Sequence, residues 1–447
     1  MTFSVILIKI AQFILSLSIL IILHESGHFV TAKIFKCRVE KFFLFFDPGF
    51  AIFKKKIGET LYGIGWLPLG GYVKIAGMVD ESMDTEQLKQ PPQPWEFRSK
   101  PAWQRLIIIV AGVTVNILLA ILIFSMMLWK WGESYLPAKN LTYGIVTDSL
   151  ARTIGLKDGD KIVTLDGKPV DNFSAVPADI ILKQIKMIGI TRNGRAMQLT
   201  IPNGFIGALI KQNKADFLEP RFPVFVDSVE PSAVFLSGKL LKNDHIISFN
   251  DKPVFFFNEF EKAKADLKNT NVKLGVLRNG SDSVTILAHL NNMGLVGFLP
   301  KSPESFFHFD TRQYSFFQAI PAGVIKGMHT IRDYGRQLKL IFFSKQVKTS
   351  QSLGGFITIG NLFPAVWDWQ AFWAMTAFLS IVLAIMNILP IPVLDGGHAL
   401  FIVAEMITGR KPSDKFLIYA QYVGLAIILT LVVYANGLDI WRHWFKH

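Results

Sequence analysis

Long apolar stretches, separated by regions in which apolar and polar residues alternate, outline this chain. Four of these stretches reach the roughly 20 residues that a helix needs to cross a bilayer. They run from residues 3 to 29, 106 to 128, 371 to 389 and 416 to 435. If each crosses once, the first and third run in the same direction. The residues after Leu389 should then emerge on the side where the first span ends.

The loop between the first two spans has a different pattern. Apolar runs at residues 42–46, 52–53 and 61–69 are separated by glycines and by the turn at residues 47–49, which favours short strands over helix. Because an open sheet edge cannot face lipid, we expect this sheet to lie in a cavity of the protein itself. Its edge either pairs with an extended peptide, or the hairpin only shields a site. Residues 80–94, rich in acidic residues, Gln and Pro, are expected to form a flexible surface stretch.

Between residues 136 and 300 the chain repeats itself. Residues 158–170 (DGDKIVTLDGKPV) return as residues 242–254 (KNDHIISFNDKPV), and each copy later carries an Arg-Asn-Gly hairpin signal, at residues 192–194 and 278–280. Two copies of one small domain are the simplest account. The copies resemble PDZ domains, which usually bind a peptide by adding it to a sheet edge. The second copy lacks two of the glycines, and a pair of domains that acts only as a steric gate is the alternative.

The segment after the repeats has a helical apolar period. Residues 314–343 place four basic residues among their polar positions, which predicts an amphipathic helix on the membrane surface or under the repeats. His308 and His329 lie before and within this segment, and we expect both to be ordinary surface residues.

Composition narrows the class of protein. Hydrophobic residues make up 51% of the 447 residues and charged residues 18%, which is too apolar for an ordinary soluble enzyme and too mixed for a purely membrane-embedded bundle. The formal charge of +13 comes from scattered, partly juxtamembrane Lys and Arg, which favours membrane lipid over nucleic acid as a partner. The single cysteine, Cys37, excludes an internal disulfide framework. Basic residues flank the loop between the first two spans. The positive-inside bias therefore predicts a cytoplasmic loop, with both termini and the central region outside.

The first span carries the motif His-Glu-x-x-His at residues 24–28. On a helix, His24 and His28 project from one face and can share a zinc ion, with Glu25 beside it. Ionisable groups at bilayer depth are costly and are by default functional or paired. The alternative is a chance match at the membrane interface. Catalytic zinc usually takes three protein ligands and keeps one position open, so a third ligand is expected elsewhere.

Asp395 is the predicted third ligand. It follows the third span, beyond Pro390 and Pro392, which end the helix, and it precedes two glycines that allow the chain to turn back sharply. The alternative is that Asp395 caps the next helix, and His398 ranks below it as a ligand. In the second span, Asn116 stands four residues after a small residue, and it serves either as a polar packing group or as a substrate contact.

These motifs together resemble the site-2 protease family of intramembrane zinc metalloproteases, in its bacterial RseP type with tandem PDZ domains. The resemblance covers nearly the whole chain, and Val113 departs from it, since relatives often have proline there. It is carried by the His-Glu-x-x-His motif, Pro68-Leu69-Gly70-Gly71-Tyr72-Val73, the repeats, Gly354-Gly355, and Asn387-x-x-Pro390-x-Pro392-x-Leu394-Asp395-Gly396.

The resemblance implies a membrane α-helical fold with four transmembrane helices, a membrane-associated β loop and two small α+β PDZ-like domains. The expected boundaries are 1–34 for the first transmembrane helix, 35–104 for the β loop and linker, 105–130 for the second transmembrane helix, 131–220 and 221–300 for the PDZ-like domains, 301–369 for the amphipathic juxtamembrane region, 370–410 for the third transmembrane helix with the Leu-Asp-Gly motif, and 411–447 for the fourth transmembrane helix and C-terminus.

The resemblance also implies a function. It points to a zinc metalloendopeptidase of the bacterial inner membrane, with its active site toward the cytoplasm and its PDZ domains on the periplasmic side. Such an enzyme cleaves transmembrane segments of single-pass proteins, such as anti-sigma factors or remnant signal peptides, in regulated intramembrane proteolysis. The alternatives are a non-catalytic membrane-anchored PDZ scaffold, a metal transporter and, among enzymes, a relative that processes pro-proteins. The predicted site residues are the zinc ligands His24, His28 and Asp395, the proton carrier Glu25, and the substrate-binding residues Asn387, Asn116, Pro390 and Pro392.

Overall fold

The structure, a computed structural model, describes residues 3–68, 70–78, 90–212, 217–343 and 354–444. The chain divides into two compact units. The first unit holds the long apolar helices, and the second holds both sequence repeats. The first comprises Met1–Gly132, Gln313–Leu338 and Ser352–His447, and the second comprises Glu133–Arg312 and Lys339–Gln351.

Among the described residues, four helices of the first unit are long and apolar enough to cross a membrane, as the four apolar stretches of the sequence predicted. The third ends at Asn387 rather than at Leu389, because the residue before a proline, here Pro390, is disfavoured in helical conformation. The four helices are α1 (Phe3–Ile34), α2 (Ala102–Trp131), α10 (Trp369–Asn387) and α12 (Asp414–Trp444), and the apolar part of α12 is Lys415–Arg442.

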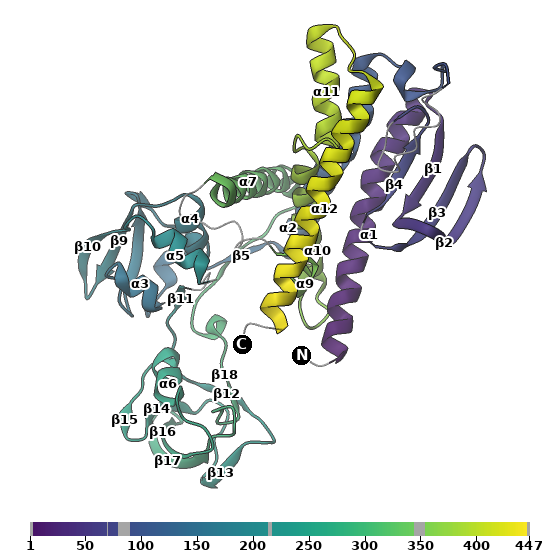
Figure 1. The fold of residues 1–447 in the computed structure, drawn as a ribbon. Coiled ribbons are helices and arrows are strands. Elements are labelled where there is room, and N and C mark those ends of the chain that lie inside the picture. The colour runs from purple at the N-terminus through teal and green to yellow at the C-terminus, as the bar shows by residue number, and fades with distance from the viewer. Residues whose placement is uncertain (1–2, 69, 79–89, 213–216, 344–353, 445–447) are drawn as a thin grey trace. The chain divides into compact units, whose positions relative to one another are not determined.

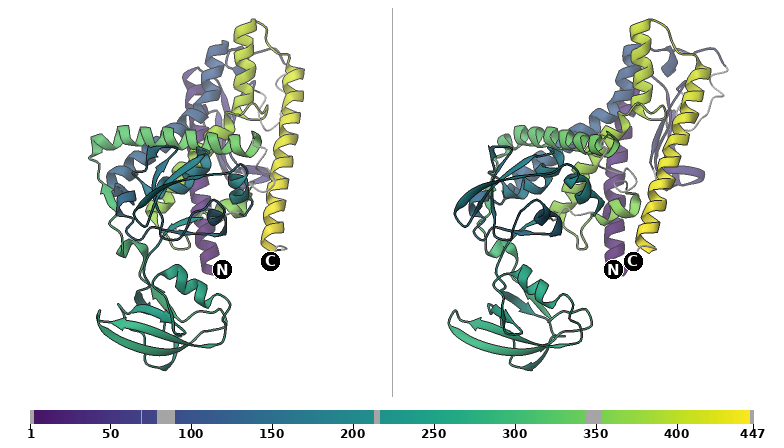
Figure 2. Two further views of the ribbon diagram at one scale, coloured as in Figure 1. Left: turned by 90° about the vertical axis from the view of Figure 1, so that its left-hand side faces the viewer. Right: turned by 60° about the vertical axis from the view of Figure 1, so that its left-hand side comes forward.

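Helices α1 and α10 run in the same direction, as the order of the spans predicted (Figures 1 and 2). Toward the start of both helices, the Thr376 hydroxyl donates to Ser16 Oγ at 3.0 Å. Toward their ends, the Asn387 amide lies 3.3 Å from His24 Nε2. The chain after α10 therefore begins beside the His-Glu-x-x-His motif.

The loop after α1 folds into a four-stranded sheet that lies beside this helix (Figure 1). Its strand order is β2-β3-β1-β4, with β1 parallel to β3 and the other pairs antiparallel. Strand β4 is thus an edge strand. The predicted strands are confirmed, whereas Leu69 and most of the predicted flexible stretch 80–94 lie outside the described residues. The strands are β1 (Val39–Leu44), β2 (Phe46–Ile57), β3 (Thr60–Leu67) and β4 (Tyr72–Ile75).

Each sequence repeat in the second unit builds its own sheets (Figure 2). Each also has its own hydrophobic core. The first repeat has sheets β10-β9-β7-β8 and β11-β6, and the second has sheets β13-β17-β16-β14-β15 and β12-β18. The elements of the first are β6 (Ile145–Thr147), α3 (Ser149–Thr153), β7 (Lys161–Leu165), β8 (Lys168–Pro169), α4 (Val176–Leu182), β9 (Met187–Arg192), β10 (Arg195–Thr200), α5 (Phe205–Lys211) and β11 (Leu218–Pro220). Those of the second are β12 (Val226–Val229), β13 (Val234–Ser237), β14 (His245–Phe249), β15 (Lys252–Pro253), α6 (Phe257–Lys264), β16 (Asn271–Arg278), β17 (Asp282–His289) and β18 (Phe298–Pro300).

Each repeat contains an equivalent ion pair between a buried aspartate and a partly buried arginine. Arg192 donates to both carboxylate oxygens of Asp160, and Arg278 does the same to Asp244. Both aspartates are 1% exposed. The predicted hairpins connect β9 to β10 and β16 to β17. Where the first repeat has Gly159 at φ +91°, the second has Asn243 at φ +73°, so the duplicated fold survives the loss of this glycine.

The remaining elements are short strands, helices and 3-10 turns. The predicted amphipathic segment forms one helix, α7, and His308 and His329 are exposed as expected. The strands are β5 (Glu133–Tyr135) and β19 (Asp310–Arg312), which pair with each other. The helices are α7 (Phe316–Phe343), α9 (Phe356–Asn361) and α11 (Asp395–Thr408). The short 3-10 turns are Phe97–Ser99, Ala138–Asn140, Phe173–Ala175 and Pro303–Ser305.

Candidate metal centre

Two imidazoles project from one face of α1. His24 and His28 are 7% and 8% exposed, and their rings meet edge to face with centroids 4.8 Å apart. Their Nε2 atoms lie 3.2 Å from each other. The four-residue spacing on a helix accounts for this arrangement, because it stacks the side chains one turn apart.

The turn between α10 and α11 brings a carboxylate to the same point. Asp395 is the first residue of α11, and Leu394 occupies the N-cap position, so Asp395 is not the cap of this helix. Gly396 and Gly397 are required here by close approach rather than by φ. A Cβ on either would lie 2.3 or 2.4 Å from the carbonyl oxygens of Ile388 and Ile391. The turn therefore closes tightly enough to aim Asp395 back at α1.

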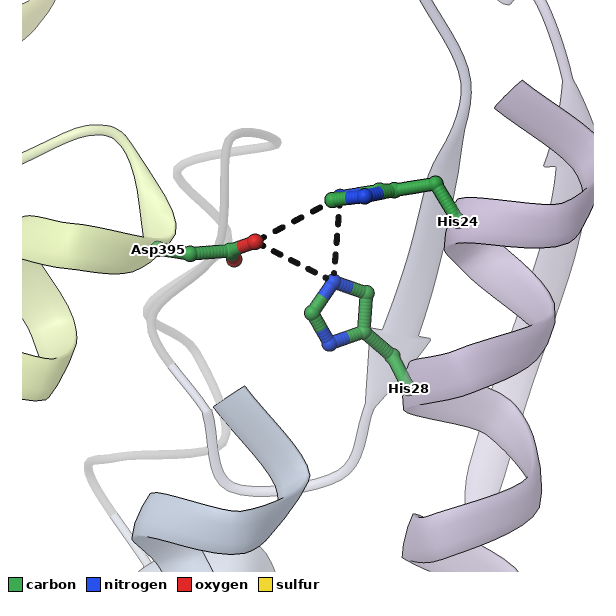
Figure 3. A group of neighbouring side chains, drawn as sticks. All are labelled: His24, His28 and Asp395. Atoms are coloured by element: carbon green, nitrogen blue, oxygen red, sulfur yellow. Dashed lines mark hydrogen bonds and ion pairs between the residues drawn. The ribbon is translucent and has the colours of Figure 1, made fainter. Parts of the chain in front are cut away.

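The three side chains form a nearly equilateral triangle of ligand atoms (Figure 3). Asp395 Oδ2 lies 3.4 Å from Nε2 of His24 and 3.4 Å from Nε2 of His28. Two ligands of a tetrahedral zinc ion, each about 2.05 Å from the metal, lie about 3.3 Å apart. Asp395 Oδ2 is also buried without a hydrogen-bond partner among the described residues. Two imidazoles and one carboxylate at these separations fit a zinc ion with its fourth position open.

A model of peptidase family M50 matches residues 12–431. The chain belongs to peptidase family M50. This is the site-2 protease family that the motifs predicted. A Rickettsia conorii protein named "Putative zinc metalloprotease" is 26% identical over 97% of this chain and 99% of its own length. A Campylobacter jejuni protein of the same name is 28% identical over 96% and 92%. The regulator of sigma E protease of Haemophilus influenzae is 24% identical over 97% and 99%.

Family membership settles the class of protein. This M50 protein is a membrane zinc metalloprotease, and the alternatives of a non-catalytic scaffold and a metal transporter are not supported. The identity of the two repeats as PDZ domains stays a prediction.

The cavity of this M50 protease opens beside the ligand triangle. Its wall includes two of the other predicted site residues, Glu25 and Asn387, and residues of the edge strand β4. The Asn387 amide, 3.3 Å from His24 Nε2, is a polar group at the metal position. The lining residues are His24, Glu25, His28, Gly71, Tyr72, Val73, Ile75, Met78, Ile109, Asn387, Val393, Leu394, Asp395 and His398.

Three other predicted residues lie elsewhere. Pro390 and Pro392 belong to the turn after α10 and do not line the cavity. Asn116 is 0% exposed and its amide lies 3.2 Å from His24 Nδ1, behind the imidazole rather than in the cavity. His398 is in the cavity wall, 3.1 Å from the Gln421 amide of α12, and it is not part of the three-ligand group.

Sequence reasoning missed the role of α2 beside the metal centre. A Cβ on Gly112 would lie 2.4 Å from His28 Nε2, so only glycine leaves room for the imidazoles. The Ile108 carbonyl oxygen lies 2.9 Å from His28 Nδ1. The signal for this contact was Gly112, the small residue four positions before Asn116, but a small residue there is equally consistent with ordinary helix packing.

Proposed function

We propose that this protease hydrolyses peptide bonds within the transmembrane segments of single-pass membrane proteins. The main support for this function is the position of the three metal ligands. His24 and His28 lie within the apolar helix α1, and α2 and α10, which also suit a membrane span, surround them. A substrate must therefore present its peptide bond within the apolar region. A metalloprotease of aqueous substrates has no need to place three ionisable side chains there.

The reaction needs a Lewis acid, a proton carrier and a polar contact for the scissile carbonyl. His24, His28 and Asp395 would hold a zinc ion, which when bound would supply the Lewis acid and lower the pKa of its water toward neutrality. Glu25, next to His24 in sequence and in the cavity wall, takes the proton of the attacking water and delivers it to the leaving nitrogen. The Asn387 amide, which lies in the cavity wall 3.3 Å from His24 Nε2, would hold the substrate carbonyl. The peptide bond breaks, and the water oxygen ends on the acyl carbon.

A transmembrane substrate must unwind before it is cut, because helical hydrogen bonds hide its carbonyls. The unwound backbone then needs new partners in an apolar cavity. Strand β4 supports strand addition as the answer. It is one of the two edge strands of its sheet, and Tyr72, Val73 and Ile75 line the cavity. A substrate strand added to β4 would have its backbone polar groups paired beside the metal.

The substrate class and the cellular setting follow from the relatives and from charge. The relative named regulator of sigma E protease supports membrane proteins of the anti-sigma factor type, or remnant signal peptides, as substrates in regulated intramembrane proteolysis. Basic residues around the β loop, including Lys33, Arg98 and Lys100, support an inner-membrane orientation with this loop in the cytoplasm and the repeats in the periplasm.

The two repeats act in this proposal as a filter for substrates with bulky outer domains. They form a closed insertion between the second and third spans, since β5 and β19 pair and bring its two ends together. Replacing residues 141–300 by a short Gly-Ser linker should let untrimmed substrates be cut while trimmed ones are cut as before. Unchanged selectivity in this variant would remove the filter from the proposal.

The central test uses the purified protein in proteoliposomes with a single-pass model substrate. We expect cleavage inside the apolar segment, located by mass spectrometry, and its loss on addition of a zinc chelator. Glu25→Gln should keep its zinc and lose about 10²- to 10⁴-fold in turnover, the usual contribution of a general base. Glu304→Gln, an exposed acid of a 3-10 turn, is the matched control. Unimpaired cleavage by Glu25→Gln, or cuts only outside the apolar segment, would contradict the proposal.

A further inference from the structure

One face of α2 packs against the imidazoles of the two histidines of the metal centre. Ile108, Gly112 and Asn116 are spaced by four residues, so they form a stripe along this helix. Ile108 and Asn116 are both 0% exposed. Each position of the stripe meets an imidazole, and together they contact both His24 and His28.

The two ends of the stripe contact the Nδ1 atoms of His28 and His24, the ring nitrogens that do not face Asp395. The Ile108 carbonyl oxygen lies 2.9 Å from His28 Nδ1, and the Asn116 amide lies 3.2 Å from His24 Nδ1. Metal-bound histidines usually donate the N–H of the second ring nitrogen to an oxygen, which fixes the tautomer and the ring direction. His28 has such an oxygen from the backbone of α2. For His24, the Asn116 side chain is the group in that position.

We propose that Asn116 is a positioning residue that accepts the Nδ1–H of His24 and holds its Nε2 toward zinc. The inference rests on the zinc site of the proposed function. Binding zinc through Nε2 puts the proton of a neutral imidazole on Nδ1. In the structure the amide nitrogen faces Nδ1, and Asn116 Oδ1 has no partner among the described residues. A half-turn of the amide exchanges these atoms and pairs the unpartnered oxygen with the Nδ1–H.

The surroundings of Asn116 separate this role from substrate binding. Its side chain does not line the cavity. Its backbone carbonyl accepts the Ser380 hydroxyl at 2.7 Å, which ties this turn of α2 to α10. Ser380 is fully buried, as are Thr376 and Ser16, which link α10 to α1. The backbone of Asn116 is therefore held by Ser380, and its side-chain amide contacts His24.

The test measures zinc affinity of the full-length protein by competition with a chelator, without any substrate. Asn116→Ala should weaken zinc binding about 10- to 100-fold, the usual effect of losing a partner of a metal ligand. Asn116→Asp keeps an acceptor oxygen and should restore most of the affinity. Thr114→Ala is the matched control on α2, because Thr114 is exposed and its hydroxyl donates to the Val110 carbonyl oxygen of the same helix.

Three results would overturn this role. Wild-type zinc affinity in Asn116→Ala together with a raised KM would assign Asn116 to substrate, and no change in either would leave it as packing alone. Equal losses of zinc in Asn116→Asp and in Asn116→Leu, which is similar in size but has no acceptor, would show that shape rather than hydrogen bonding matters; this pair also serves if Asn116→Ala does not fold. Because zinc affinity is measured without substrate, a failure of the proposed proteolysis leaves this readout intact.

Discussion

Gly112→Ala puts the packing of α2 on the metal centre to a direct test. The added Cβ would lie 2.4 Å from His28 Nε2 and 2.6 Å from His24 Cε1, whereas ordinary contacts begin at 3.4 Å. One or both imidazoles must therefore retreat by about 1 Å. Zinc–ligand distances vary by only about 0.2 Å, so this displacement is several times what coordination tolerates. We expect zinc affinity to fall at least 100-fold, which corresponds to about 2.7 kcal/mol.

The same substitution should not destabilise the helix itself, since alanine favours helix over glycine by about 1 kcal/mol. Zinc affinity by chelator competition and thermal unfolding of the metal-free protein measure the two effects separately. Gly437→Ala is the matched control, because Gly437 lies in α12 and a Cβ there meets nothing within 4 Å. If Gly112→Ala binds zinc within threefold of the wild type, α2 does not approach the imidazoles this closely.

Three further predictions concern the metal and the repeats. A zinc chelator should abolish proteolysis, with activity returning when zinc is restored in excess; activity that survives complete removal would contradict a metal mechanism. Asp160→Ala should lower the unfolding free energy by about 3 kcal/mol, since it leaves the partly buried Arg192 without its partner, and calorimetry that shows under 0.5 kcal/mol would refute this. Burial raises the pKa of Asp158, but hydrogen bonds from Thr147 and the ammonium of Lys262 outweigh it and lower the pKa from 3.8 to about 2. The stabilising contribution of the Asp158 carboxylate is thus complete above about pH 4 and is lost as the pH falls toward 2. The difference in unfolding free energy between the wild type and Asp158→Asn should therefore shrink between pH 4 and pH 2 and stay constant above pH 4.

Much of this fold was predictable because its signals are local. An apolar run of about 20 residues has few stable forms other than a buried or membrane-spanning helix. The Arg-Asn-Gly turns identified both hairpins, because Asn193 and Gly194 adopt the positive φ that such turns require. The His-Glu-x-x-His spacing placed two imidazoles on one helix face, since that relation depends only on helical period. Parity of the spans then brought Asp395 to the same side.

Other features depend on contacts between segments that are distant in the sequence, and local sequence patterns do not predict such contacts. Asn116 was predicted to be a packing group or a substrate contact, and only the packing of α2 against α1 places its amide on His24. Pro390 and Pro392 were predicted to contact substrate, but they lie in the turn after α10 and are not among the residues of the cavity wall.

The sequence alone determined which residues can bind the metal, because ligand chemistry and helical spacing are properties of the chain. Only the tertiary structure decided how those ligands are held. The distances among His24, His28 and Asp395, the glycine that makes room for them on α2 and the strand edge beside them arise where four separate segments pack together. Packing is fixed by the whole set of buried surfaces at once, and so no single stretch of sequence contains it.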